Sequence, residues 1–105
     1  MDKRAVKKII DYLKAELRRH GVKISGIALF GSQLKETSGK KNDIDLIIIS
    51  DVFRNKNIFK RGNLTMDAEI KTLRKFMVPM DILKMTPEEY RLAIDNKRYK
   101  TQLLA

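Results

Sequence analysis

The chain has 105 residues, of which 43% are hydrophobic, a length and composition that suit one compact domain with a modest core. It has no cysteine, which excludes disulfides, zinc–thiolate sites and thiol nucleophiles, and no apolar run near the ~20 residues of a membrane span. Its net charge of +10 favours phosphate-bearing partners, although a lysine-rich solvated surface, as in a heat-adapted protein, explains that charge equally well.

The N-terminal segment carries apolar residues at steps of three and four, which predicts an amphipathic helix through Val6, Ile9, Ile10, Leu13 and Leu17. Arg18, Arg19 and His20 followed by Gly21 predict its C-terminal end. His20 is the only histidine and therefore a candidate base, but capping or surface exposure is the favoured interpretation. The start of the chain lacks the apolar stretch of a signal peptide, and we expect a cytoplasmic protein.

Two apolar segments follow and predict strands at Val22–Phe30 and Asp43–Ser50. Between them, Ser32 is expected to cap a short helical turn through Glu36, and residues 37–42 form a polar loop. Residues 52–63 are expected to be a less regular connection that contains Gly62.

The C-terminal half is expected to add a helix, a strand and a final helix. Spacing predicts the first helix from Met66, Ile70, Leu73 and Met77, and then a strand over 78–85 that Pro79 places at a sheet edge. Thr86-Pro87-Glu88-Glu89 is typical of a helix start, and that helix should run past Ile94. Residues 96–105 are expected to be a basic tail. We therefore expect one α/β domain over residues 1–105, with its core at about 22–95.

Asp43 and Asp45 are the first candidate site residues. Residues two apart on a strand point to the same face, so their carboxylates can converge on one hard cation. An isolated Asp-x-Asp is, however, more often a solvated loop. Gly31-Ser32 upstream adds a backbone that a phosphate can approach and a hydroxyl donor, although the same pair also describes an ordinary turn. Together these residues predict phosphate donors beside metal ligands.

Asp81 interrupts an otherwise apolar strand and is the third candidate. An unpaired carboxylate inside a strand is costly, so Asp81 should have a cation, a donor or access to water. Alone, it is more simply an edge-strand residue facing solvent. Beside Asp43 and Asp45 it would complete a three-carboxylate site able to hold two metal ions.

The chain contains Leu29-Phe30-Gly31-Ser32, nine intervening residues and then Asn42-Asp43-Ile44-Asp45-Leu46. This pattern resembles the signature of the DNA polymerase β-like nucleotidyltransferase superfamily. The length and layout of the chain are similar to those of the minimal nucleotidyltransferase (MNT) branch of this superfamily. The likeness extends to Pro79-Met80-Asp81-Ile82 and Thr86-Pro87-Glu88-Glu89, and in all it covers residues 22–90. The resemblance implies a nucleotidyltransferase-like fold, a small mixed sheet flanked by helices. Many members have glycine where Glu36 stands and serine where Asn42 stands, which bears on the loop conformation and leaves the acids untouched.

The resemblance also implies roles: Gly31 and Ser32 bind the triphosphate, while Asp43, Asp45 and Asp81 are catalytic metal ligands and Asp81 helps to activate the attacking hydroxyl. The expected reaction is magnesium-dependent transfer of a nucleoside monophosphate, with ATP as donor and one or two ions, to an acceptor hydroxyl. Lys35, Lys40 and Lys41 are candidates for phosphate contact or for a solvated loop face.

Minimal members of the superfamily are often antitoxins encoded beside a helical HEPN protein, which some of them adenylylate. We therefore expect a HEPN-type partner or a homodimer, and no membrane. Two alternatives stay open: an antitoxin whose nucleotide site only binds or is catalytically weak, and an RNA-binding protein that uses the +10 charge.

Overall fold

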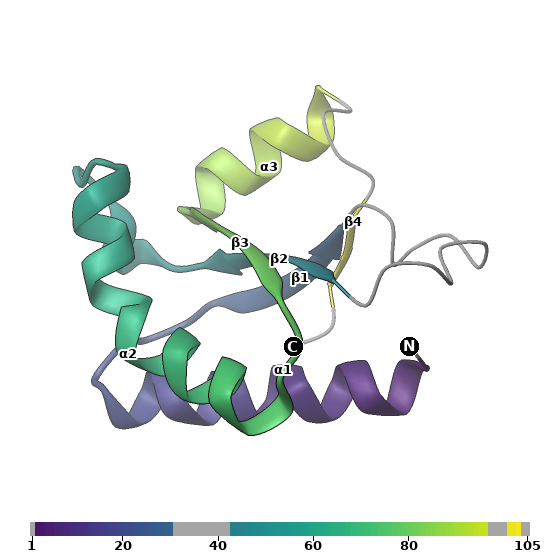
Figure 1. Ribbon diagram of the computed structural model, residues 1–105. Coiled ribbons are helices and arrows are strands. Elements are labelled where there is room, and N and C mark those ends of the chain that lie inside the picture. Colours follow the sequence, from purple (N-terminus) through teal and green to yellow (C-terminus); the bar gives the residue numbers. More distant parts are fainter. Residues whose placement is uncertain (1, 31–42, 97–100, 104–105) are drawn as a thin grey trace.

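The computed structural model describes residues 2–30, 43–96 and 101–103, which form a small α/β domain (Figure 1). The elements are α1 (Lys3–Arg19), β1 (Gly26–Phe30), β2 (Ile44–Ile49), the 3-10 helix η2 (Asp51–Phe53), α2 (Ile58–Phe76), β3 (Met80–Met85), α3 (Pro87–Asp95) and β4 (Thr101–Leu103). Among these residues, no helix combines the length and the apolar character that crossing a membrane takes.

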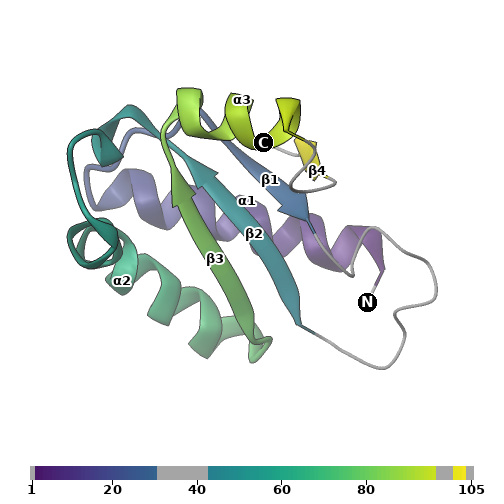
Figure 2. The same cartoon turned by 90° about the horizontal axis from the view of Figure 1, so that it is seen from above.

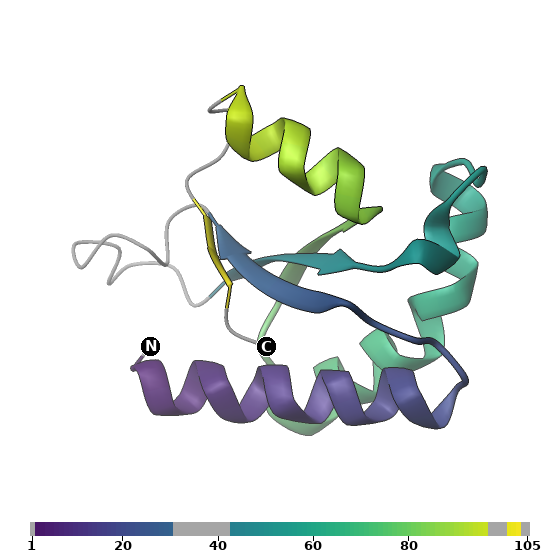
Figure 3. The same ribbon diagram turned by 180° about the vertical axis from the view of Figure 1, so that it is seen from behind.

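The sheet is mixed and has the strand order β3-β2-β1-β4. Strand β2 pairs antiparallel with β1 and parallel with β3, while β4 pairs antiparallel with β1. Helices α1 and α2 lie over one face of the sheet and α3 lies over the other (Figures 1 and 3). The expected fold class, a small mixed sheet flanked by helices, is confirmed.

The core has two parts, one on each face of the sheet. The larger part joins α1 and the strand residues that face it, and its members include Ile10, Leu13, Ile27, Leu46 and Ile48. The smaller part, under α3, joins Ala28, Ile47 and Ile49 with half-buried neighbours that include Phe30 and Tyr90. Because β2 contributes alternate residues to both parts, it is buried on both faces, as its continuous apolar sequence predicts.

The first helix forms as its spacing predicts. Asp2 caps α1 by accepting a hydrogen bond from the backbone N–H of Ala5, and His20 is the C-cap residue, with Nδ1 2.8 Å from the carbonyl oxygen of Glu16. Gly21 has φ +78°, which glycine adopts without strain. His20 therefore ends a helix, in agreement with the favoured interpretation.

Three predicted segments differ from the structure. Strand β1 begins at Gly26 and not at Val22, because Val22 still donates its N–H to Leu17 in the turn that closes α1. The irregular connection predicted over 52–63 is wrong from Ile58 onward, since α2 begins there and the Asn57 side chain accepts a hydrogen bond from Lys60 N. The tail over 96–105 is wrong in part, because residues 101–103 form β4 against β1.

Two other predictions agree with the structure. Strand β3 lies at an edge of the described sheet, and α3 begins with a capping box in which Thr86 and Glu89 exchange side chain-to-backbone hydrogen bonds. The turn over 32–36 and the loop over 37–42 lie outside the described residues.

Candidate active site

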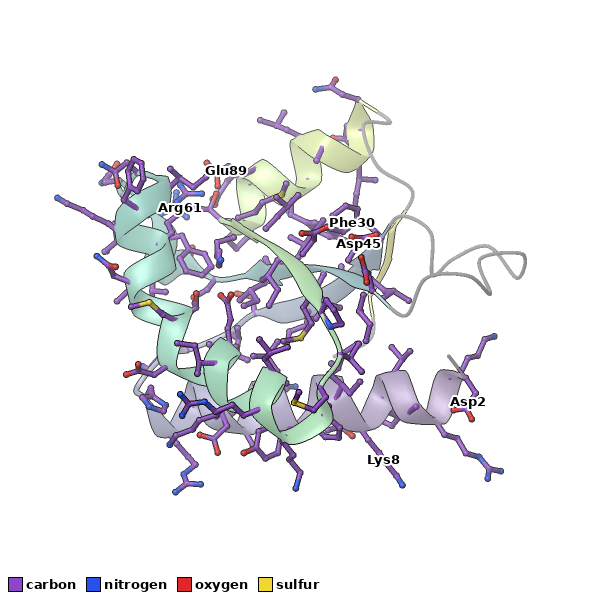
Figure 4. All side chains as sticks on the ribbon, viewed as in Figure 1. Asp2, Lys8, Phe30, Asp45, Arg61 and Glu89 are labelled. Carbon is purple, nitrogen blue, oxygen red and sulfur yellow. The ribbon has the colours of Figure 1, made fainter. Side chains whose placement is uncertain are left out.

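Asp45 and Asp81 are neighbours on adjacent strands. In the parallel register of β2 and β3, Asp45 is opposite Asp81, and in the antiparallel register of β1 and β2 it is opposite Phe30. Paired residues on adjacent strands present their side chains on the same face, so the two carboxylates and the Phe30 ring share one face. Figure 4 shows Phe30 and Asp45 side by side at this end of the sheet.

That face is the one under α3. Asp45 alternates with Ile47 and Ile49, and both belong to the smaller core cluster, which Tyr90 of α3 also contacts. Asp45 is half-buried, at the point where the apolar cover of α3 gives way to polar residues, and Asp81 is exposed. The pair therefore lies half under protein and half in solvent, where a bound molecule can reach it.

Asp43 lies immediately before β2 and is half-buried. The next residue, Ile44, donates its N–H to the carbonyl oxygen of Pro79 at 3.0 Å, and this bond fixes the entry of β2 beside the entry of β3. The chain therefore brings all three acids to the same end of the β2–β3 pair. Of these, only Asp45 and Asp81 are in direct register.

Carboxylates in adjacent register repel each other, and their closeness attracts cations. Among the described residues, no group of three or more Asp, Glu or His side chains is arranged to hold a metal ion. The oxygen donors nevertheless suit magnesium, which proteins commonly bind through one or two carboxylates while substrate phosphates and waters supply the other ligands. The described acids thus fit a shared site, completed by a phosphate ligand, better than a closed protein cage.

Gly31 and Ser32 lie outside the described residues, as do Lys35, Glu36, Lys40, Lys41 and Asn42. They follow Phe30, the last residue of β1, and Phe30 is opposite Asp45. The segment that contains the two predicted phosphate-binding residues therefore starts from the strand position beside the acids. Their roles remain predictions.

Two aromatic residues of this region were not predicted to be site residues. Phe30 is opposite Asp45 on one side and Thr101 of β4 on the other. Tyr90 joins the same cluster from α3. A signal for Phe30 existed, since it ends an apolar strand directly before Gly-Ser, whereas Tyr90 comes close only through the placement of α3.

A cation fixes the start of α3 to the sheet. Arg61 of α2 donates to both carboxylate oxygens of Glu89 and to the carbonyl oxygen of Lys84 on β3. The hydrogen bonds from Arg61 lower the pKa of Glu89 below its ordinary value, and the N–H of Thr86 acts in the same direction. Glu89 is thus kept ionised while it caps α3, and the contact links α2, the end of β3 and the start of α3, at the end of the sheet away from Asp45 (Figure 4).

Comparisons with known proteins identify the family of the chain. The chain matches the family described as "Nucleotidyltransferase domain" over residues 6–104. No curated protein matches it. Among solved structures, a protein of Sulfolobus solfataricus assigned as a nucleotidyltransferase is similar with a TM-score of 0.51 and 17% identity, covering 98% of this chain and 87% of that one.

Two plant structures share the fold as well. BolA1 from Arabidopsis thaliana has a TM-score of 0.54 and 16% identity over 77% of this chain and 94% of its own. The BolA domain of SufE1 from the same plant has a TM-score of 0.51 and 22% identity over 85% of this chain and 98% of its own. At these identities the likeness concerns the fold alone.

Proposed function

Because the chain belongs to the nucleotidyltransferase domain family, we propose that it transfers a nucleoside monophosphate from a triphosphate to an acceptor hydroxyl, with Asp43, Asp45 and Asp81 as the catalytic acids. The family supports the general class, a nucleotidyl transfer. One observation carries the assignment to these residues: Asp45 and Asp81 are in register on one face of the sheet, at the end where Asp43 enters it.

Magnesium is the ion that this donor set fits, because it prefers carboxylate oxygens and accepts phosphate and water as further ligands. We assign Asp43 and Asp45 as its main protein ligands and Asp81 as a shared one. When bound, the ion would neutralise charge on the phosphates and lower the pKa of an acceptor hydroxyl. A second ion would need ligands from the triphosphate as well.

The protein's own contribution is placement. Asp81 is exposed at the start of an edge strand, so an acceptor can reach it from solvent, and we assign it to hold the acceptor hydroxyl. Phe30 and the α3 cluster shield the opposite side of Asp45, and the lower local dielectric strengthens its interaction with cations. Gly31 and Ser32, which follow Phe30, are proposed to bind the triphosphate.

We propose ATP as the donor and a helical protein of the HEPN type as the acceptor. Both follow from the resemblance of the Gly-Ser and Asp-x-Asp motifs, and of the chain length, to the minimal nucleotidyltransferases. The positive net charge of +10 supports a phosphate-bearing donor. A site that binds nucleotide without transferring it is the competing function.

The test incubates the chain with α-labelled ATP, magnesium and a purified HEPN-type protein, and compares wild type with Asp45→Asn and Asp81→Asn. Asp11→Asn is the matched control, because Asp11 is an exposed acid on α1, on the opposite face of the sheet. We expect label transfer by wild type and the control, and a loss of about 100-fold or more in each site variant. Transfer that persists in both site variants would refute the assignment.

Binding is measured separately from transfer. Mn²⁺ binding, followed by electron paramagnetic resonance with and without ATP, reports the acid site without an acceptor. Tighter Mn²⁺ binding in the presence of ATP, lost in Asp45→Asn, supports a shared site. Binding without transfer to any acceptor favours the competing function.

A further inference from the structure

Helix α2 carries a stripe of large apolar side chains that face solvent. The residues of its inner face that are buried are small, namely Thr65, Ala68 and Thr72. The outer stripe consists of Ile58, Phe59, Met66, Ile70, Leu73 and Met77. The exposed fraction is 74% for Ile58 and 78% for Phe59, and it lies between 39% and 77% for the other four. The spacing that predicts the helix therefore marks its outer face and not its core face.

The extent of the exposed surface is that of an interface. If a fully exposed large side chain presents roughly 200 Å², these six present on the order of 700 Å². The largest apolar patch of a typical monomer is about 300–600 Å², and one partner of a standard protein interface buries about 800 Å². The part from Met66 onward accounts for on the order of 400 Å² of this surface, the size of a single functional patch.

The position of α2 leaves this stripe accessible. The helix runs beside the edge strand β3 at one border of the molecule, with α1 on its other flank (Figure 2). Figures 1 and 3 show that α2 changes direction along its length. Gly62 and Thr65, whose hydroxyl lies 3.4 Å from the Gly62 carbonyl oxygen, favour such a bend. The seam considered below therefore uses only the part from Met66 onward.

In that part, Met66, Ile70 and Leu73 follow each other at steps of four and three, and Met77, the left-handed residue that caps the helix, comes four residues later. This is the spacing by which one helix packs along another. Two copies related by a twofold axis between Ile70 and Leu73 place Ile70 against Leu73 of the second copy. The next layer then joins Met66 to Met77 of the second copy.

The charges beside the seam are complementary in the same arrangement. Asp67 and Arg74 are exposed, lie on the same flank, and take part in no ion pair among the described residues. Antiparallel packing in the register above brings Asp67 of one copy close to Arg74 of the second copy, between the Ile70–Leu73 layer and the Met66–Met77 layer. The twofold axis repeats this pair of opposite charges. A parallel order would instead offer Arg74 to Glu69, which Lys84 and Thr65 already bind.

We propose that two copies of this chain associate through an antiparallel contact between the C-terminal parts of their α2 helices. Met77 of each copy then meets Met66, which lines a groove of about 350 Å³ together with Phe59, Gly62 and Ile70. The proposal does not depend on the proposed function.

The first test is the mass of the full chain by sedimentation velocity across a concentration series. We expect a dimer that Ile70→Glu weakens by about 100-fold, since it buries a charge in the seam. Leu92→Glu is the control, because Leu92 is an equally large exposed residue on α3, and it should leave the dimer intact. Circular dichroism confirms that both variants fold. A wild-type monomer at all concentrations, or a dimer indifferent to Ile70→Glu, overturns the proposal.

The register is tested by charge exchange. Asp67→Arg and Arg74→Asp should each weaken the dimer about tenfold, and the double exchange should restore it, because the two residues are ~10 Å apart within one helix and meet only between copies. No restoration overturns the antiparallel register.

The absence of cysteine gives a second measurement without background. Ile70→Cys mixed with Leu73→Cys should form the mixed disulfide in preference to either homodisulfide. A preference for Ile70→Cys homodisulfides would indicate a parallel order and overturn the proposal in this form.

Discussion

The Arg61 guanidinium holds the Glu89 carboxylate across 28 residues of sequence, with Nη1 2.6 Å from Oε1 and Nη2 3.1 Å from Oε2. The same side chain donates to the carbonyl oxygens of Lys56 and Lys84 and lies over the Phe53 ring. With only 15% of its side chain exposed, Arg61 connects the start of α2 to the sheet and to α3.

Arg61→Ala is expected to destabilise the fold by about 2–3 kcal/mol, because it removes a donor from two carbonyl oxygens and leaves the Glu89 carboxylate with only the N–H of Thr86. Arg61→Lys should recover little, since an ammonium cannot bind in the bidentate geometry. Urea unfolding measures both. Arg54→Ala is the control, because Arg54 pairs with Glu88 in solvent and its loss should have a much smaller effect. Equal effects of the two alanine variants would contradict this role for Arg61.

The pair also predicts a dependence of stability on pH. Since the pKa of Glu89 is lowered in the folded state, its contribution is fully present above the ordinary value of 4.5 and is lost as pH falls through the folded value. Glu89→Gln should therefore flatten the loss of stability on acidification below about pH 4.5. In an Arg61→Ala background the same change should have little effect. Urea midpoints between about pH 5 and pH 3 provide the comparison.

Glu16 and Lys71 offer a separate prediction about the α1–α2 contact. The Glu16 side chain is only 4% exposed, and its Oε2 lies 3.6 Å from Lys71 Nζ with no hydrogen-bond partner among the described residues. Lys71→Met should cost about 1–2 kcal/mol because it leaves Arg19, 3.2 Å from Oε1, as the remaining cation at the buried Glu16 carboxylate. Glu16→Met should be close to neutral. Thermal unfolding of the two variants tests this order, and the reverse order would show that the pair itself is stabilising.

The candidate site is expected to lower the free energy of unfolding, because it holds two like charges side by side. Asp81→Asn removes one of two like charges in adjacent register, so in magnesium-free buffer it should stabilise the fold by up to about 1 kcal/mol. Magnesium with ATP should raise the melting temperature of wild type and leave the variant unchanged. Asp95→Asn, at the end of α3, is the control for loss of an exposed charge. A destabilised Asp81→Asn would point to a structural role for this carboxylate.

The elements with strong local signals were predictable. Val6, Ile9 and Leu13 define the buried face of α1, and Thr86 with Glu89 defines the start of α3, because helix periodicity and capping act within a few residues. The start of α2 was missed because Gly62 suggests a break, while the Asn57 cap that begins the helix precedes two apolar residues that stay exposed.

What depends on distant partners was not predictable. Strand β4 is three residues long and exists because β1 offers it an edge. The register that sets Asp45 beside Asp81 follows from the parallel pairing of β2 with β3 after the α2 crossover. The Asp-x-Asp motif and the later acid in a strand predicted a shared site, but the residues that lie next to each other in it are known only from the strand pairing.

Strand β4 has a consequence for how the protein is handled. Residues 101–103 cover the outer edge of β1 at Ala28, Leu29 and Phe30, and Ala28 and Leu29 are buried. A chain cut before Thr101 would present unpaired backbone groups there, beside an apolar sequence, and exposed edges of this kind recruit further strands. Truncated preparations should therefore aggregate edge to edge, and a purification tag belongs at the N-terminus, ahead of Asp2.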